Sequence, residues 1–303
     1  MSARDPGDRA PAAPTGPGPS DPIDPRHHVS EYFRLQRWEI PPADGAERMS
    51  EFGGRTPVED HQCGAGGGLL TGGLLTSVDS LGGMAAGLAV LPRWIVTTSM
   101  MATIGRVSHQ GPLRLHGRVL RRGRNSVVVG LDVVDEGDHD VPVAAVTMTC
   151  AVLDPVGMDL HFDRPLVVDM PPPSPNARTP EEFFCIEPGG GPVTRLRLDD
   201  HLRNPWGILH GGAVAVLADV AARRAVVAHR SAGGGDRPAA DPARLAAADT
   251  ILHYLRPVKV GPVEARCDVL GGGPTRTLVR VAIHDVGADD RLVELAMVAV
   301  LAV

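Results

Sequence analysis

The chain contains an internal repeat, and this constrains its fold more than any other feature. Gly111-Pro112-Leu113 is matched 150 residues later by Gly261-Pro262-Val263, and Asp79 is matched 140 residues later by Asp219. The ten extra residues of the longer spacing fall in a segment rich in Gly, Pro and Asp, 231–241. Self-similarity at a fixed spacing indicates that one structural unit has been duplicated. The sequence therefore predicts two copies of one unit.

Each copy has the same order of elements, one long apolar helix and then several strands. The helices are expected over 69–90, ended by Pro92, and over 211–229. Strand-like runs are expected at 95–104, 113–120, 126–134, 141–153, 193–198, 249–255, 263–270, 275–284 and 292–303. A helix followed by antiparallel strands buries its surface when a curled sheet wraps around it. The expected fold class is α+β, with two units related by a pseudo-twofold axis.

Composition divides the chain into five segments. Residues 1–28 are Pro-, Gly- and Ala-rich and are expected to be a disordered tail, because they contain too little apolar surface to offset ordering. A lead-in segment follows at 29–68, with a short helix expected at 29–38. The first unit spans 69–153 and the second 193–303, joined by a Pro-rich linker over 154–192.

Charge and composition exclude several classes of partner. The 30 Lys and Arg residues against 36 Asp and Glu give a net charge of −6, and aromatic residues make up only 3%. Neither nucleic acid nor a membrane surface is an expected partner. The longest apolar stretch, 80–91, is far shorter than the ~20 residues of a membrane helix. The tail has no signal-peptide pattern, so a cytoplasmic location is expected.

The four cysteines carry no metal-binding pattern. Cys63, Cys150, Cys185 and Cys267 lie far apart and form no CxxC pair. No metal site is expected, and the thiols are interpreted as reduced structural residues.

The most informative string is Asn204-Pro205-Trp206-Gly207-Ile208-Leu209-His210-Gly211-Gly212, directly before an expected helix. Backbone N–H groups at a helix start lack partners within the helix and favour negative charge. Such an end can polarise a carbonyl oxygen, and glycine lets an acyl group approach closely. On spacing alone, a glycine-rich helix cap with a structural histidine explains the string equally well.

These residues resemble a known family. The pattern Asn-Pro-x-Gly-x-x-His-Gly-Gly, with Asp219 nine positions after His210, is similar to the hotdog-fold acyl-CoA thioesterases of the PaaI-like branch. The stretch 254–258, Tyr-Leu-Arg-Pro-Val, followed by Gly261-Pro262, resembles a strand of that family. The resemblance covers 193–303 well and 69–153 more weakly.

The resemblance implies active sites between two units, with Asn and Gly from one unit and an acid and a Ser or Thr from the other. One complete composite site is then expected, with catalytic residues Asp79, Thr97, Asn204, His210 and Gly211 and with Gly212, Gly83 and Arg256 binding substrate. The second combination, around Asp219 and Gly72, looks degenerate. It has Leu70, Thr71 and Ala247 where the first has His210, Gly211 and Thr97, and Arg223 stands four residues after Asp219.

The implied reaction is thioester hydrolysis. Gly211 N–H is expected to stabilise the oxyanion, and Asp79 to act either as general base or as nucleophile. Asn204 would orient water or the carbonyl, and Thr97 the water. His210 is expected to hold the loop rather than to act as base. No metal or redox cofactor is implied, and coenzyme A enters only as part of the substrate.

Two other functions are weighed for this sequence. A non-catalytic module that binds acyl thioesters is compatible with one degenerate half. A hotdog enoyl-CoA hydratase is not, because His210 lies six residues after Asn204 instead of three. A homodimer of the two-unit chain is also an expectation.

Overall fold

The computed structural model describes residues 29–36, 38–40, 50–64, 67–154, 166–168, 178–189, 192–204, 206–232, 241 and 244–303. The expected tail 1–28 and most of the expected linker lie outside these residues. The boundaries of the five segments therefore stay predictions.

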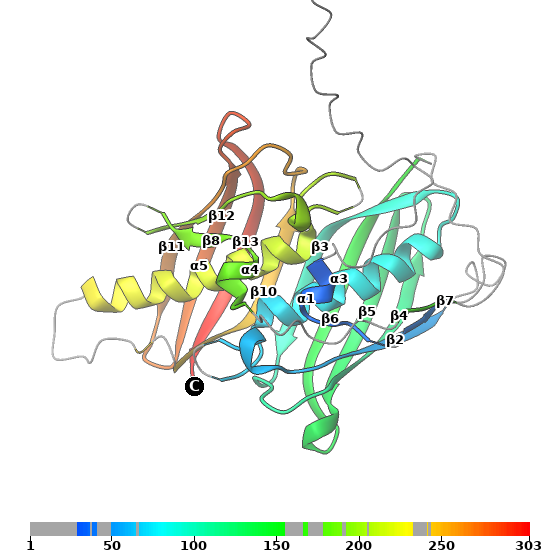
Figure 1. Cartoon of the computed structure of the whole chain (residues 1–303), viewed down its shortest axis with the longest axis horizontal. Coiled ribbons are helices and arrows are strands. Elements are labelled where there is room, and N and C mark those ends of the chain that lie inside the picture. The colour runs from blue at the N-terminus through cyan, green and yellow to red at the C-terminus, as the bar shows by residue number, and fades with distance from the viewer. Residues whose placement is uncertain are drawn as a thin grey trace, which may run out of the picture.

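The body of the protein is one antiparallel sheet of eleven strands that runs through both halves (Figure 1). The order of its strands is β2-β4-β5-β6-β3-β10-β13-β12-β11-β9-β8. In the first half they are β2 (Glu51–Thr56), β3 (Trp94–Ile104), β4 (Leu113–Arg122), β5 (Ser126–Asp135) and β6 (Val141–Leu153). In the second half they are β8 (Ile186–Pro188), β9 (Val193–Leu196), β10 (Leu245–Tyr254), β11 (Val263–Gly272), β12 (Arg276–Asp285) and β13 (Arg291–Ala302). A separate pair joins β1 (Trp38–Ile40) to β7 (Leu166–Val168).

The two halves join edge to edge through β3 and β10. These strands are antiparallel, with Met100 opposite Leu252 and Ser99 opposite His253. Met100 and Leu252 are fully buried, so the seam belongs to the core. Along β5 the burial alternates, with Val127, Val129, Leu131 and Val133 facing inward. This alternation is that of an antiparallel sheet covered on one face.

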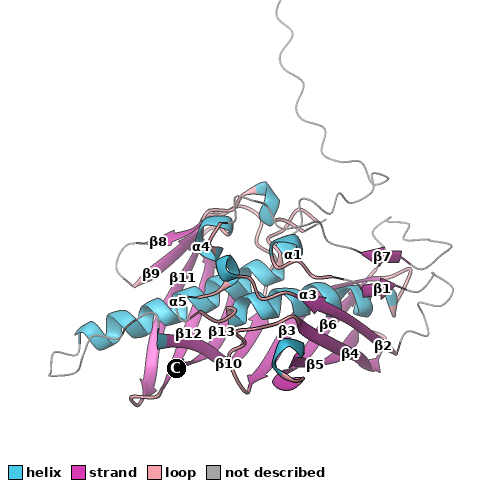
Figure 2. Cartoon of the chain, turned by 60° about the horizontal axis from the view of Figure 1, so that its bottom comes forward, coloured by secondary structure: helices cyan, strands magenta, loops and turns pink. Residues whose placement is uncertain are grey.

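Two long helices, α3 (Thr71–Leu88) and α5 (Gly211–Ala232), lie against the same face of the sheet (Figures 1 and 2). α3 contacts the strands of the first half, and α5 those of the second. The two helices meet at their N-terminal halves. A Cβ on Gly72 would come within 2.6 Å of Val216 Cα, and one on Gly212 within 2.8 Å of Thr76 Cα. Glycine at both positions therefore allows the two helix starts to touch.

The repeat is visible in the turns as well as in the elements. β4, β5 and β6 begin 150 residues before β11, β12 and β13. Asp135 is buried and accepts the Gly111 N–H at 2.9 Å, and its counterpart Asp285 accepts the Gly261 N–H at 2.8 Å. A buried carboxylate needs such partners. Each copy therefore uses the same carboxylate to fix the same turn.

Segments outside the two repeats pack on the helices. The short helix expected at 29–38 ends early, as α1 (Val29–Tyr32), and stacks on α4 (Pro180–Phe183) through Tyr32 and Phe183, whose ring centroids are 4.3 Å apart.

The strand β2 pairs with β4 as β9 pairs with β11. The first half of the sheet therefore includes a strand from the lead-in segment, ahead of Leu69. Single 3-10 turns lie at η2 (Asp60–Gln62), η3 (Glu136–Asp138) and η4 (Asp200–Leu202).

Candidate active site

Asp79 lies in the middle of α3 and is only 8% exposed. The hydroxyl of Thr97, on β3, donates to Asp79 Oδ1 at 2.9 Å. Thr97 stands at a register shift, between Thr97 and Ser99, where β3 pairs with β6. Such a bulge turns a side chain away from the regular alternation of a strand. The sheet of the first half therefore holds one oxygen of this carboxylate.

The other oxygen of Asp79 faces the start of α5, in the second half. His210 Nδ1 lies 3.6 Å from Asp79 Oδ2. A Cβ on Gly211 would come within 2.8 Å of the same oxygen, so only glycine fits here without moving the carboxylate. The N–H groups in the first turn of a helix have no acceptor within the helix. The structure thus brings Asp79 and Thr97 from one half to His210 and Gly211 from the other.

His210 is a neutral, buried ring in this arrangement. Burial lowers its pKa to about 4. Its Nδ1 accepts the Gly212 N–H at 3.0 Å and so carries no proton in the neutral ring. The approach of Nδ1 to Asp79 is for that reason not an ion pair. His210 holds the first turn of α5 in place.

Three further predicted site residues are Asn204, Gly83 and Arg256, and no contact joins Arg256 to this centre within the described residues. The side-chain oxygen of Asn204 accepts the N–H groups of Trp206, at 3.0 Å, and Ile208, at 3.3 Å. Asn204 therefore shapes the loop that leads to His210. Gly83 is one helical turn after Asp79, and nothing lies within 4 Å of the position its Cβ would take. Arg256 is exposed and donates to the Leu292 carbonyl at 3.0 Å.

No role in the site was expected for Tyr254, Glu294 or Cys150. The Tyr254 hydroxyl donates to the Gly211 carbonyl at 3.1 Å and so ties the start of α5 to β10. Burial raises the pKa of Tyr254 and Glu294 well above their usual values, and the negative charge of Asp79 adds to both shifts. Burial and the same charge raise the pKa of Cys150 to about 12. A lone Glu between apolar neighbours, Val293 and Leu295, was the one signal that could have identified Glu294.

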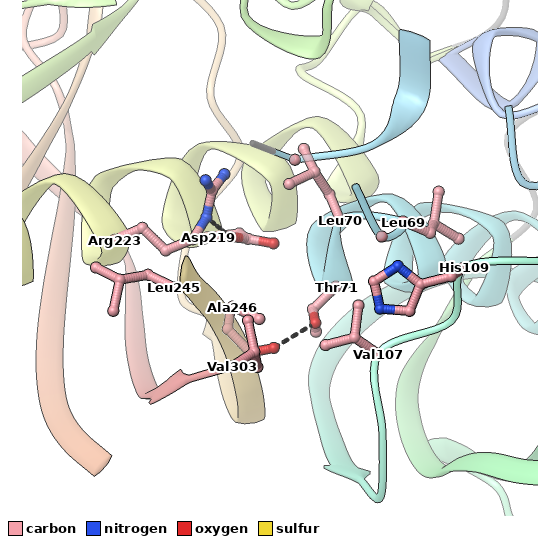
Figure 3. Close-up of a pocket in the computed structure, with 13 residues that line it drawn as sticks. Leu69, Leu70, Thr71, Val107, His109, Asp219, Arg223, Leu245, Ala246 and Val303 are labelled. Atoms are coloured by element: carbon pink, nitrogen blue, oxygen red, sulfur yellow. Dashed lines mark hydrogen bonds and ion pairs between the residues drawn. The ribbon is translucent and has the colours of Figure 1, made fainter. Parts of the chain in front are cut away.

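The corresponding position in the other half, at Asp219, is closed by internal contacts (Figure 3). Arg223 Nε donates to Asp219 Oδ1 at 2.7 Å, and the Gly72 N–H donates to Oδ2 at 2.9 Å. The side chain of Asp219 is 3% exposed and that of Arg223 11%. Thr71 Oγ1 donates to the Ala247 carbonyl at 2.6 Å. Both oxygens of this carboxylate are therefore bonded to the protein itself.

A small hollow lies beside this second carboxylate. Apolar side chains, among them Leu70, Val107 and Leu245, line most of it (Figure 3). His109 is exposed and also lines it. Gly64, the counterpart of Asn204, is part of the same lining.

Two general features concern the whole described part of the chain. Within it, no group of three or more His, Cys, Asp or Glu residues is arranged to hold a metal ion. None of its helices has the length and apolar character needed to cross a membrane.

Comparison with known proteins identifies the fold. The model of the thioesterase superfamily matches residues 66–142 and 207–290, one segment in each half. A candidate oleoyl thioesterase from Lactobacillus plantarum is 12% identical, with a TM-score of 0.57, over 85% of this chain and 98% of its own. A TesB protein from Mycobacterium avium subsp. paratuberculosis is 13% identical, with a TM-score of 0.55, over 84% and 93%.

An acyl-ACP thioesterase from Bacteroides thetaiotaomicron is 10% identical, with a TM-score of 0.52, over 85% of this chain and 99% of its own. At these identities the likeness concerns the fold, a tandem hotdog. No curated protein matches the chain in sequence.

Proposed function

Because the chain belongs to the thioesterase superfamily, we propose that it hydrolyses acyl-CoA thioesters to a free acid and coenzyme A. The reaction takes place at one composite site between the halves, with Asp79 and Thr97 from the first and the start of α5 from the second. One observation carries the proposal: a buried carboxylate, held by Thr97 at 2.9 Å, faces a helix start that has no room for a side chain at Gly211.

The proposed chemistry follows from these contacts. The Gly211 N–H polarises the thioester carbonyl and stabilises the oxyanion, an interaction worth about 3 kcal/mol per donor. As general base, Asp79 removes a proton from water while the water oxygen bonds to the carbonyl carbon. The C–S bond then breaks, and the proton passes to the departing thiolate. As nucleophile, Asp79 would instead bond to the carbonyl carbon, the C–S bond would break to release the thiolate, and water would then hydrolyse the resulting anhydride.

The remaining residues orient the reacting groups. Thr97 holds Asp79 Oδ1, which leaves Oδ2 directed at the start of α5. His210 and Asn204 shape the loop that presents Gly211. Gly83 leaves space one turn after Asp79 for the substrate. Arg256, which is exposed, would bind the phosphates of coenzyme A.

The proposal also includes the type of unit, the need for cofactors, the location and assembly of the protein, and the number of active sites. α3 and α5 act as the central helices of two hotdog units of the PaaI-like type. The reaction needs no metal or redox cofactor, and the protein works in the cytoplasm, as a single two-unit chain or a homodimer. Only the Asp79 site turns over substrate, since Arg223 and Gly72 occupy both oxygens of Asp219.

Thiol release measured across short, long and aromatic acyl-CoAs tests the proposal. The wild-type chain should hydrolyse at least one class, and Asp79→Asn should abolish that turnover. Binding of acyl-CoA without hydrolysis of any member would contradict it and would favour a non-catalytic acyl-thioester binding module.

A further inference from the structure

Glu294 is a buried carboxyl group that the proposed reaction does not use. It is 1% exposed, and neither of its oxygens has a hydrogen-bond partner within the described residues. An unpaired carboxylate in such a place is strongly destabilising, so a buried carboxyl group without a partner needs an explanation.

The position of Glu294 connects it to the start of α5. On β13 it lies directly opposite Tyr254 of β10. By strand alternation it shares the inner face of the sheet with the buried residues Ala296 and Val298. Tyr254 in turn donates to the carbonyl of Gly211, whose Cα borders Asp79. Glu294 is thus beside the groups that build the proposed site.

The fold itself does not require a carboxyl group here. The counterpart of Glu294, 150 residues earlier, is Ala144, and that of Tyr254 is Ile104. The strand of the first half forms with alanine at this position, opposite Ile104. Glu294 is therefore present in the half whose helix start faces Asp79, and absent from the half whose helix start is bonded to Asp219.

We infer that Glu294 is a positioning residue that must be uncharged for the Asp79 site to work, so that its ionisation stops hydrolysis. The inference rests on the proposed function. Two carboxyl groups that influence each other in a buried site ionise in separate steps, because the second negative charge is opposed by the first. With Glu294 neutral, Asp79 is the one anion of the pair. With both charged, proton transfer to Asp79 and the geometry at Gly211 are disturbed.

The titratable groups near Glu294 come from several elements. Asp79 of α3 acts on Glu294, and Asp79 and Cys150 of β6 act on Tyr254 of β10. His210, before α5, lies 3.6 Å from Asp79, and Ile283 of β12, directly opposite Glu294, is apolar. Burial holds the pKa of His210 at about 4 and that of Cys150 at about 12, and raises that of Tyr254 above its usual value of 10. Burial and the charge of Asp79 raise the pKa of Glu294 itself. A loss of activity at alkaline pH that Glu294 variants lack would therefore report the ionisation of Glu294.

The test is the pH profile of kcat/KM for three chains: wild type, Glu294→Gln and Glu294→Ala. Glutamine keeps the shape without the titration, and alanine copies Ala144 of the other half. On the alkaline side the wild type should lose activity tenfold per pH unit. Relative to their own maxima, both variants should keep at least tenfold more activity one unit above the wild-type midpoint. Asp219→Asn, a matched change in the other half, should leave the alkaline limb in place.

A second readout does not depend on activity. The infrared band of a protonated carboxyl group should be present in the folded wild type at neutral pH and disappear at the midpoint of the alkaline limb. An ionised Glu294 at neutral pH, or an alkaline limb unchanged in both variants, would overturn the inference while leaving the proposed function intact. A wild type that hydrolyses no acyl-CoA at any pH would overturn both.

Discussion

The same two elements, a helix start and the middle of the other helix, meet twice in this protein, with opposite results. At one meeting Asp79 contacts the Thr97 hydroxyl and the start of α5. At the other, Asp219 is bonded to Arg223 of its own helix and to the Gly72 N–H. The backbone arrangement is kept in both, so the difference lies in a few side chains. Both halves keep the fold after duplication, whereas the chemical groups are kept at only one of the two meetings, the one at Asp79.

The substituted positions all lie around the helix starts. Four polar residues near Asp79 have apolar counterparts near Asp219, namely His210 and Leu70, Thr97 and Ala247, Tyr254 and Ile104, and Glu294 and Ala144. At a fifth pair of positions the second half has the polar residue. Arg223 stands where the first half has Gly83, and it forms an ion pair with Asp219. A buried carboxylate that serves no reaction is stabilised by such a partner.

Exchanging the two carboxylates for amides should give the largest difference between the sites. Asp79→Asn removes the proposed base or nucleophile, and kcat should fall about 10³-fold. Asp219→Asn should change kcat by less than about threefold, because Asp219 is already bonded to Arg223 and Gly72. Steady-state thiol release measures both. Loss of turnover in Asp219→Asn alone would reverse the assignment of the two sites.

The buried histidine should make stability depend on pH in one half only. The pKa of His210 is about 4 in the folded chain and about 6.5 when unfolded, so the unfolded state binds more protons between these values. The stabilisation is complete above about pH 6.5 and is lost as pH falls towards 4, by about 3 kcal/mol in total.

His210→Leu copies Leu70 of the other half and should remove that dependence. Urea unfolding at pH 4, 5, 6 and 7 compares the variant with the wild type. An identical loss of stability in both chains would show that His210 is not the group responsible.

A methyl group at the helix start should distort the reactive site and spare the other. Gly211→Ala places a Cβ within 2.8 Å of Asp79 Oδ2, so the carboxylate must move, and kcat should fall about 10²-fold. At the matched position, Thr71→Ala removes only a hydrogen bond to the Ala247 carbonyl, which stabilises the fold by about 1 kcal/mol. Wild-type kcat in Gly211→Ala would place the reaction elsewhere.

Removing the hydroxyl that donates to Asp79 should have the smallest effect on kcat in the series. Thr97→Val keeps the shape of the side chain and removes its hydrogen bond to Oδ1, so kcat should fall about tenfold. The reciprocal change, Ala247→Thr, adds the hydroxyl in the second half and should not create activity. An unchanged kcat in Thr97→Val would mean that Asp79 is oriented by other contacts.

The fold was largely predictable because the same order of helix and strands occurs in both copies, so each copy confirms the elements expected in the other. The expected run 141–153 is β6, and the expected helix 211–229 is α5 with three more residues at its end. Strands β2 and β8 were not predicted, since short edge strands in Gly- and Pro-rich segments have weak patterns. Their pairing with β4 and β9 depends on tertiary contacts.

The site residues that could be predicted are those that act through their own backbone or through a residue close in sequence. Gly211, His210 and Asp79 belong to this group, and the spacing of Asp219 and Arg223 fits an ion pair on one helix face. Tyr254 and Glu294 were assigned no role because their positions beside Gly211 and Asp79 follow from strand register across β10 and β13. One sequence does not specify that register. Asn204 was expected to orient water or the carbonyl, and the sequence did not indicate that its side-chain oxygen also holds its own loop.

The number of substrate molecules that bind per chain tests the central claim most directly. A non-hydrolysable acyl-CoA analogue titrated into the protein by calorimetry should saturate at one molecule per 303-residue chain. Asp219→Asn should leave that number at one. Saturation at two molecules per chain would contradict the claim that a single composite site, at Asp79, survives in the duplicated fold.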